Sequence, residues 1–144
     1  MQEAKVRILV LCTGNSCRSQ MAQGFLRTWL PNALVRSAGT APGKRVHPMA
    51  VAVMRDVGID LTGNTLTSVQ KFVGQRWDWV LTVCGGAKES CPVFTGQVRH
   101  RIHIGFDDPA NATGTPDEIR AAFEHIRDEI AEQLQVWVRR QILA

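Results

Sequence analysis

Residues 6–11 (VRILVL) form a nearly continuous run of branched apolar residues, and this run restricts the possible folds more than any other feature. The pattern is typical of a parallel β-strand that is buried on both faces. A loop follows at residues 12–18, and apolar residues then recur at helical spacing until Pro31 ends the pattern. The first motif of the chain is therefore strand, loop and helix.

The alternation of strands and helices continues along the chain. We expect strands at residues 34–39, 79–83 and, more weakly, 101–106. We expect helices at residues 48–57, which Gly58 would close, and at residues 67–73. This order is typical of an open sheet connected by helices.

The last helix has the clearest sequence signature. Residues 115–118 (TPDE) supply an N-cap, a proline in the first turn and a capping-box glutamate. The residues of its predicted core stripe are Ile119, Phe123, Ile126, Ile130, Leu134 and Val138.

The length of 144 residues fits one domain over residues 1–144. With 44% hydrophobic and 21% charged residues, the chain can bury an ordinary globular core. We therefore predict a single α/β domain, with an open parallel sheet of about four strands and helices on both faces. We expect a monomer.

The formal net charge is +4, but the Lys and Arg residues are dispersed among acidic ones, so we expect no nucleic-acid partner. The positive field suits a small anionic substrate.

The apolar stretch near the N-terminus is too short for a signal peptide, and no segment approaches the roughly 18 apolar residues of a membrane span. We expect a cytoplasmic protein with no membrane partner. There, four cysteines indicate catalysis, redox cycling or metal binding.

The most specific motif lies between the first strand and its helix. It consists of Cys12, Thr13, Gly14, Asn15, Ser16, Cys17, Arg18 and Ser19. Five residues between Cys12 and Arg18 allow a tight loop whose backbone N–H groups converge on a tetrahedral oxyanion. The helix N-terminus adds partial positive charge, and Arg18 can bind two oxygens at once. We therefore predict that residues 13–19 bind the substrate.

Cys12 is the predicted nucleophile of this loop. The positive surroundings should lower the pKa of its thiol, and Ser19 could hydrogen-bond the thiolate. Gly14 permits close backbone approach, while Asn15 tolerates a left-handed conformation and its amide can brace the loop. A lone cysteine would more simply be a buried apolar residue, but the complete octet argues against that interpretation.

The Cys-x5-Arg-Ser motif resembles that of the low-molecular-weight protein tyrosine phosphatases and of the arsenate reductases that share their fold. The resemblance implies Cys12 as nucleophile, Arg18 as oxyanion clamp and an aspartate before proline as general acid. Asp108 matches that acid, because it precedes Pro109 and would protonate the departing oxygen. By itself, Asp-Asp-Pro would equally suit an ordinary turn.

A second pair of cysteines, Cys84 and Cys91, exceeds what a hydrolytic phosphatase needs. Cys84 ends a predicted strand, so it should lie at the same sheet edge as Cys12. A relay is then possible: Cys12 attacks arsenate, Cys84 attacks Cys12 and releases arsenite, and Cys91 attacks Cys84 to form a Cys84–Cys91 disulfide. Gly85 and Gly86 should let the intervening segment rearrange.

This cysteine pattern resembles the thioredoxin-coupled arsenate reductases over essentially the whole chain, through residues 105–110 (GFDDPA). The resemblance implies arsenate as substrate, with phosphate or sulfate as competing oxyanions. It also implies thioredoxin as partner and electron donor, with no bound cofactor.

Several positions depart from the related families. Some of these reductases bind potassium through acidic side chains where this chain has Gln23 and Thr67, and they carry a histidine where it has Asn64. We therefore expect no bound metal, and the spacing of the four cysteines does not suit zinc either. Tyrosine is absent, and Ala110 stands where the tyrosine phosphatases usually have an aromatic residue, which disfavours phosphotyrosine as substrate.

Two alternatives remain open at this point. The chain could be a phosphomonoesterase that uses Cys12, Arg18 and Asp108, with Cys84 and Cys91 as redox protection. It could also be a thiol sensor or oxyanion-binding module that signals through a partner, although no output segment is recognisable.

Overall fold

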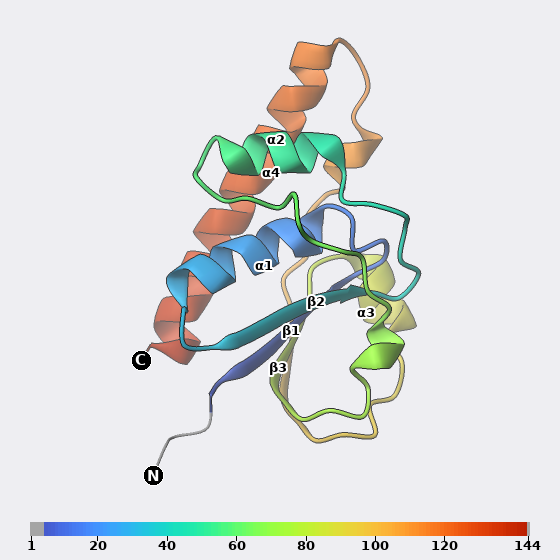
Figure 1. Cartoon of the computed structure of the whole chain (residues 1–144), viewed down its shortest axis with the longest axis vertical. Helices are drawn as coiled ribbons and strands as arrows, with labels where there is room; N and C mark the ends of the chain where they lie inside the picture. Colours follow the sequence, from blue (N-terminus) through green and yellow to red (C-terminus); the bar gives the residue numbers. More distant parts are fainter. Residues whose placement is uncertain (1–4, 144) are drawn as a thin grey trace.

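The computed structural model describes residues 5–143, and its centre is a four-stranded sheet (Figure 1). The sheet order is β2-β1-β3-β4, and each neighbouring pair is parallel. Its strands are β1 (Arg7–Cys12), β2 (Leu34–Gly39), β3 (Trp77–Thr82) and β4 (Val98–His103). The predicted α/β class and four-stranded parallel sheet are confirmed.

Helices lie on both sides of the sheet. The main ones are α1 (Arg18–Trp29), α2 (Pro48–Arg55), α3 (Gly85–Ser90) and α4 (Pro116–Trp137). Within residues 5–143, the chain also forms the 3-10 turns η1 (Val69–Lys71) and η2 (Pro109–Asn111) and the π-helical turn η3 (Val138–Ile142). Helices α1, α2 and α4 lie together on one side, while α3 and η1 lie on the other (Figure 1).

The central strand β1 has the burial that its sequence predicts. Ile8, Leu9, Val10 and Leu11 are each 0% exposed, because β2 and β3 flank the strand and both faces of the sheet are covered. The strand ends at Cys12, so the loop that follows lies at the carboxyl edge of the sheet.

Helix α4 has the predicted start and core stripe. Thr115 and Glu118 form a complete capping box. Phe123, Ile130 and Leu134 are fully buried, Val138 is buried although it lies in η3, and Ile119 is only half-buried. Trp137, which the predicted stripe omitted, is buried as well.

Polar contacts join α4 to α2. Arg120 pairs with Asp56, and Arg127 donates to the carbonyl oxygen of Val53 at 3.0 Å.

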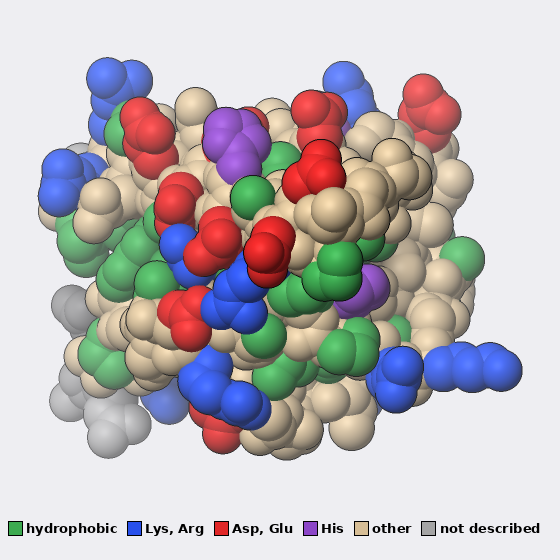
Figure 2. All heavy atoms as spheres, turned by 90° about the horizontal axis from the view of Figure 1, so that it is seen from above, with side chains coloured by type: hydrophobic (Ala, Val, Ile, Leu, Met, Phe, Trp, Pro, Cys, Tyr) green, Lys and Arg blue, Asp and Glu red, His purple; other side chains and the backbone are tan. Residues whose placement is uncertain are grey.

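On the face seen in Figure 2, acidic and basic side chains are interspersed, so this face has no patch of a single charge.

The predicted helix at residues 67–73 is wrong, because only η1 forms there. Thr67 and Ser68 precede it and contact the carboxyl end of β2: the Gly39 N–H donates to the Thr67 carbonyl at 2.8 Å, and Gly39 bridges to Ser68. These tertiary contacts override the local helical pattern.

Other boundaries differ by a few residues. Strand β3 begins two residues before the predicted start, and β4 lies three residues earlier than predicted. The predicted extension of β4 still partly pairs with β3, since the N–H groups of Ile104 and Phe106 donate to the Thr82 and Val83 carbonyls, each at 3.0 Å. Gly58 has a φ of 82° and closes α2 as expected.

Helix α3 is a six-residue helix that the sequence interpretation treated only as a segment able to rearrange. Across residues 5–143, no helix combines the length and apolar character needed to cross a membrane.

Candidate active site

The loop of residues 13–17 connects β1 to α1, and its outer side is covered by residues 40–47. The N–H groups of Thr40, Ala41, Gly43 and His47 donate to the carbonyls of Cys12, Thr13, Gly14 and Ser16 at 3.1, 2.9, 2.9 and 2.8 Å. Since these carbonyls are engaged on the outer side, the inner side of the loop is free to present backbone N–H groups, as the Asn15 N–H does toward Cys12 Sγ at 3.2 Å. Such a concave arrangement suits an oxyanion.

Asn15 braces this loop, as predicted from its residue type. Its φ is 55°, and it is fully buried. Its side-chain amide donates to the hydroxyls of Ser19 at 2.8 Å and Ser37 at 3.0 Å, and its side-chain carbonyl accepts from the Thr67 N–H at 3.0 Å. One asparagine thus ties the loop to α1, β2 and the segment before η1.

Gly39 permits the close approach of β2 to the loop. A Cβ atom at this position would lie 2.5 Å from the carbonyl oxygen of Thr13 and 3.1 Å from the Cβ of Asn15. Any side chain would therefore push the loop away. The predicted need for glycine at position 14 has weaker support, because a Cβ there would meet only Ser16, at 3.4 Å.

The Cys12 thiol is 2% exposed and lies at the base of the loop. Its Sγ is 2.8 Å from the Ser19 hydroxyl, as predicted, and accepts from the Asn15 N–H at 3.2 Å. Burial raises the pKa of Cys12, while the hydrogen bonds from Ser19 and Asn15 act in the lowering direction. The expectation that the loop lowers this pKa is therefore contradicted: desolvation outweighs the hydrogen bonds.

Arg18 and Asp108 come together at the mouth of the loop, although they are distant in sequence. The Arg18 guanidinium donates to the Phe106 carbonyl at 3.0 Å and lies 3.4 Å from the Asp108 carboxylate. Asp108 also accepts from the Ala110 N–H at 3.0 Å and so caps η2. The residues predicted as clamp and acid thus share one site, and the proline turn fixes the carboxylate beside it.

Cys84 lies beside the loop, where the sheet edge was expected to place it. It is 3% exposed, and its Sγ lies 3.4 Å from the Thr13 hydroxyl and accepts from the Ala87 N–H at 3.3 Å. Helix α3 approaches the loop closely, since a Cβ on Gly86 would lie 2.6 Å from the Thr13 hydroxyl. The charge of Cys84 would further raise the pKa of Cys12, which indicates that the two thiols are electrostatically coupled.

Cys91 lies at the other end of α3 and is not brought to the loop. Its half-buried side chain lines a hollow of about 290 Å³ that includes Lys88, Arg101 and His103. All four cysteines are free. The structure therefore places Cys12 and Cys84 at one site and holds Cys91 apart from it.

Cys17, within the loop, is 4% exposed. Burial raises the pKa of its thiol, and the negative charge of Asp108 raises it further. It is thus held as a neutral thiol, in keeping with the absence of any assigned role beyond its place in the loop.

Two residues of the site, Ser37 and Gly39, were missed by the sequence analysis, and Thr67 was noted only as a position where some related reductases have an acidic potassium ligand. Ser37 and Gly39 end β2, so their place at the carboxyl edge of a predicted strand was the signal that could have identified them. The contact of Thr67 with Asn15 was not predictable, because it depends on a loop whose path the sequence does not reveal.

Gln23 and Thr67 stand where some related reductases have acidic potassium ligands. Both residues line a polar cavity beside β2. Asn64, at the histidine position, donates to Gln20 at 3.0 Å. Over residues 5–143, no group of three or more His, Cys, Asp or Glu side chains is arranged to hold a metal ion.

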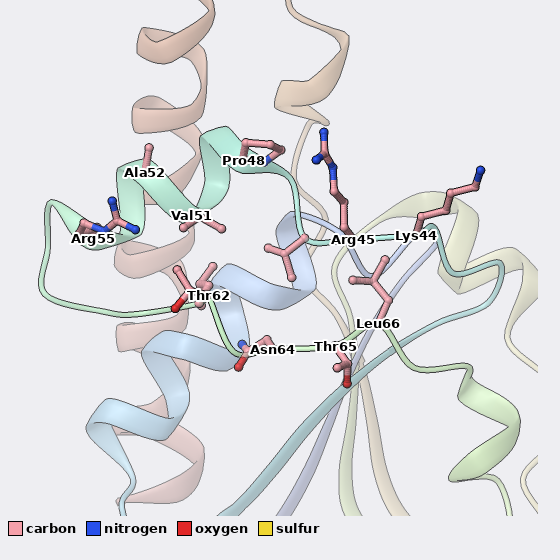
Figure 3. A pocket seen from close by; sticks show the side chains of 12 residues that line it. Lys44, Arg45, Pro48, Val51, Ala52, Arg55, Thr62, Asn64, Thr65 and Leu66 are labelled. Atoms are coloured by element: carbon pink, nitrogen blue, oxygen red, sulfur yellow. The ribbon is translucent and has the colours of Figure 1, made fainter.

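A separate hollow of about 590 Å³ lies between α2 and residues 61–66. Arg45 and Lys44 stand at one end of it and Arg55 at the other (Figure 3). None of the predicted catalytic residues lines this hollow, so it is distinct from the anion loop.

Comparisons with known proteins agree with this architecture. The sequence profile of the low molecular weight phosphotyrosine protein phosphatases matches residues 7–143. An arsenate reductase of Halalkalibacterium halodurans is 43% identical over 131 residues, which cover 90% of this chain and 93% of that protein.

Two solved structures of an arsenate reductase share the fold. One, in the phosphate-binding state, is 28% identical with a TM-score of 0.73 and covers 94% of this chain and 98% of its own. The other, in the oxidised state, is 27% identical with a TM-score of 0.75 and covers 93% and 97%. With its Cys-x5-Arg loop, its parallel sheet and these matches, the chain belongs to the low molecular weight phosphotyrosine protein phosphatase family.

Proposed function

We propose that this protein reduces arsenate to arsenite through a relay of Cys12, Cys84 and Cys91. The observation that carries the proposal is the position of Cys84, whose thiol touches the anion loop at Thr13. A hydrolase needs no second thiol there. The similarity to arsenate reductases supports the same assignment.

In the first step, arsenate is held by the N–H groups of the loop and by Arg18. Cys12 attacks arsenic, forming a sulfur–arsenic bond, and one arsenate oxygen leaves as water after Asp108 protonates it. The Arg18–Asp108 contact of 3.4 Å supports this assignment, because it places the arginine that would bind the oxyanion next to the aspartate that would protonate the leaving oxygen. The engaged carbonyls on the outer side keep the cradle electropositive.

Cys12 must lose its proton for this attack. Because burial raises its pKa, the hydrogen bonds from Ser19 and the Asn15 N–H stabilise the thiolate only partly. We propose that the proton passes from Cys12 to an oxygen of the entering arsenate dianion, while Arg18 turns from the Phe106 carbonyl toward the bound oxyanion.

In the second step, the Cys84 thiolate attacks the Cys12 sulfur. The Cys12–arsenic bond breaks, its electron pair stays with arsenic, and arsenic(V) becomes arsenic(III) as arsenite departs. A Cys12–Cys84 disulfide remains. The packing of Gly86 against Thr13 supports this step, since it keeps Cys84 beside the loop.

In the third step, Cys91 attacks Cys84, which frees Cys12 and leaves a Cys84–Cys91 disulfide. Helix α3 must unwind for this, because a helix rise of about 1.5 Å per residue separates the two Cα atoms by roughly 10 Å. A disulfide requires a Cα separation below about 7 Å. The helix has six residues and starts with two glycines, so its unwinding costs little.

The product disulfide needs an external reductant, and we propose thioredoxin, in keeping with the resemblance to thioredoxin-coupled enzymes. No bound cofactor takes part in this scheme. A relay of free thiols works only in a reducing compartment, so we place the protein in the cytoplasm.

The coupled assay with NADPH, thioredoxin reductase and thioredoxin tests this function. We expect arsenate-dependent NADPH oxidation that Cys84→Ser and Cys91→Ser each abolish. Ser90→Ala, an exposed substitution in the same helix, is the matched control and should retain turnover. A folded, reduced protein without turnover would contradict the proposal.

Hydrolysis of phosphomonoesters is the second candidate, because the family profile and the Arg18–Asp108 pair suit it equally. It predicts fast hydrolysis of an aryl phosphate that survives Cys84→Ser and Cys91→Ser. Slow hydrolysis alone does not distinguish the two candidates, since one loop binds both oxyanions.

A further inference from the structure

A polar cavity of about 460 Å³ lies beside the edge strand β2, between α1 and residues 63–75. Four cationic side chains line it: Arg7, Arg27, Arg36 and Lys71. No Asp or Glu is among its lining residues, and Cys12, Arg18 and Asp108 belong to a different site. The positive charge here is therefore gathered around one cavity.

Two of these cations are held together by a shared acceptor. The Arg27 and Arg36 guanidinium groups both donate to the Val35 carbonyl oxygen, at 3.1 and 3.0 Å. Burial lowers the pKa of Arg27, and the charge of Arg36 lowers it further. Like charges this close repel each other unless an anion lies nearby.

The protein itself supplies no such anion within the part of the chain that the structure describes. Its ion pairs engage other cations, including Arg18, Arg76, Arg99, Arg120 and Arg127, and none involves the four around the cavity. Arg7 donates to the Arg76 carbonyl and the Gln75 side chain, which are both neutral. The positive charge of the cavity is thus uncompensated.

The floor of the cavity offers hydrogen bonds as well as charge. Gln23 is 5% exposed and Ser37 is 6% exposed, and both line the cavity. Because the Gln23 side chain is part of the cavity wall, its amide can reach an occupant of the cavity. The Gln23 amide and the Ser37 hydroxyl therefore add hydrogen-bonding groups to the positive charge of the cavity.

We propose that this cavity is a second oxyanion site, separate from the catalytic loop, which binds a phosphate- or sulfate-type dianion. The Arg27 and Arg36 guanidinium groups have further N–H donors that can bind its oxygens, and Gln23 donates from the buried side. A dianion between the two arginines removes their mutual repulsion. This site does not depend on the proposed reductase function.

The cavity adjoins the brace of the catalytic loop. Ser37 and Thr67 line it, and both bond Asn15. Substituting them would disturb the loop as well as the cavity, so a clean test changes the exposed rim. Arg27 and Arg36 are suitable, because both lie at the surface rather than in the core and their guanidinium groups bond Val35, not Cys12 or Arg18.

The test measures phosphate and sulfate binding by calorimetry at constant ionic strength set with chloride. Arg18→Gln serves as the background, because it weakens anion binding at the loop. In this background we expect one bound dianion per chain. Adding R27Q and R36Q should weaken that binding at least about tenfold, since each charged hydrogen bond contributes substantially.

The matched control is Arg18→Gln with R139Q and R140Q, which removes the same charge from exposed positions in η3. It should retain the affinity of the background within about twofold. Loss of all binding in the Arg18→Gln background would overturn the proposal, and so would equal losses in the two triple variants.

Nuclear magnetic resonance of the unaltered protein gives an independent test if the Arg18→Gln background does not fold. We expect the Nε–H signals of Arg27 and Arg36 to shift on titration with phosphate. Unshifted signals at concentrations that saturate the loop amides would contradict the second site.

Discussion

Burial, hydrogen bonds from Ser19 and Asn15, and the charge of Cys84 together set the pKa of the Cys12 thiol. Ser19 and the Asn15 N–H stabilise negative charge on the sulfur, whereas burial opposes it and is the larger effect. The pKa is therefore raised, and the thiolate fraction of the unliganded protein should keep rising with pH between about 7 and 9. Alkylation by iodoacetamide, which requires the thiolate, should follow the same trend.

Ser19→Ala should raise the pKa of Cys12 further, because it removes a hydrogen bond that favours the thiolate. A shift of about one unit would slow alkylation of Cys12 about tenfold at neutral pH. Site-resolved mass spectrometry across a pH series measures this shift. Ser16→Ala, in the same loop, is the control and should leave the profile in place; identical profiles for all three proteins would show that Ser19 has no such role.

Gly39→Ala should disrupt the loop, since the added Cβ would lie 2.5 Å from the Thr13 carbonyl oxygen. We expect a loss of about 1–3 kcal/mol in the free energy of unfolding and a clear loss of turnover. Gly63→Ala is the matched control, because a Cβ there has nothing within 4 Å. Thermal unfolding and the coupled assay check both variants, and equal behaviour of the two would refute the steric argument.

At the scale of single elements, α3 connects the two cysteines that must meet. It packs against the loop at Gly86, but a Cβ added to its first residue, Gly85, would have nothing within 4 Å. Gly85→Ala should therefore stabilise the helix without a clash, by up to about 1 kcal/mol. Its unwinding, and with it the attack of Cys91 on Cys84, should slow by up to about fivefold.

Rapid quenching after mixing with arsenate measures this effect. Gly85→Ala should accumulate more of the Cys12–Cys84 disulfide than the unaltered protein, whereas Gly63→Ala should not. An unchanged level of that disulfide would mean that α3 does not limit the resolving step.

The elements differ in how well the sequence predicted them, for physical reasons. Strand β1 and helix α4 were predicted well, because continuous burial and a capping box leave clear local patterns. The helix at 67–73 was wrong, since contacts with Gly39 and Asn15 keep its first residues out of a helix. Strand β4 was displaced because it is an edge strand with many exposed, charged residues and a weak apolar pattern.

The candidate site shows the same division. The order Cys12 to Ser19 predicted the loop, the bracing Asn15 and the Ser19 contact, and the strand ends brought Cys84 to the loop of Cys12. The direction of the Cys12 pKa was not predictable, because it depends on how completely the thiol is buried. The distance of Cys91 from the loop was also not predictable. It results from a short helix that begins with two glycines, and glycines do not indicate a helix in the sequence.

At the scale of the whole molecule, one core supports both the sheet and the site. Ile130 of α4 is fully buried, so Ile130→Ala should lower the free energy of unfolding by about 2–5 kcal/mol. Val136→Ala, on the same helix, should change it by less than about 1 kcal/mol, because Val136 is 43% exposed. Urea unfolding measures both, and similar losses would argue against the packing described for α4.

The arsenate relay is the central claim, and a single turnover without reductant tests it most directly. The reduced protein is mixed with one equivalent of arsenate under anaerobic conditions, and arsenite and disulfides are then quantified by speciation and peptide mass spectrometry. The account predicts one arsenite per chain, a Cys84–Cys91 disulfide, and free thiols at Cys12 and Cys17. A protein that yields no arsenite, or that yields arsenite without any disulfide at Cys84, would contradict it.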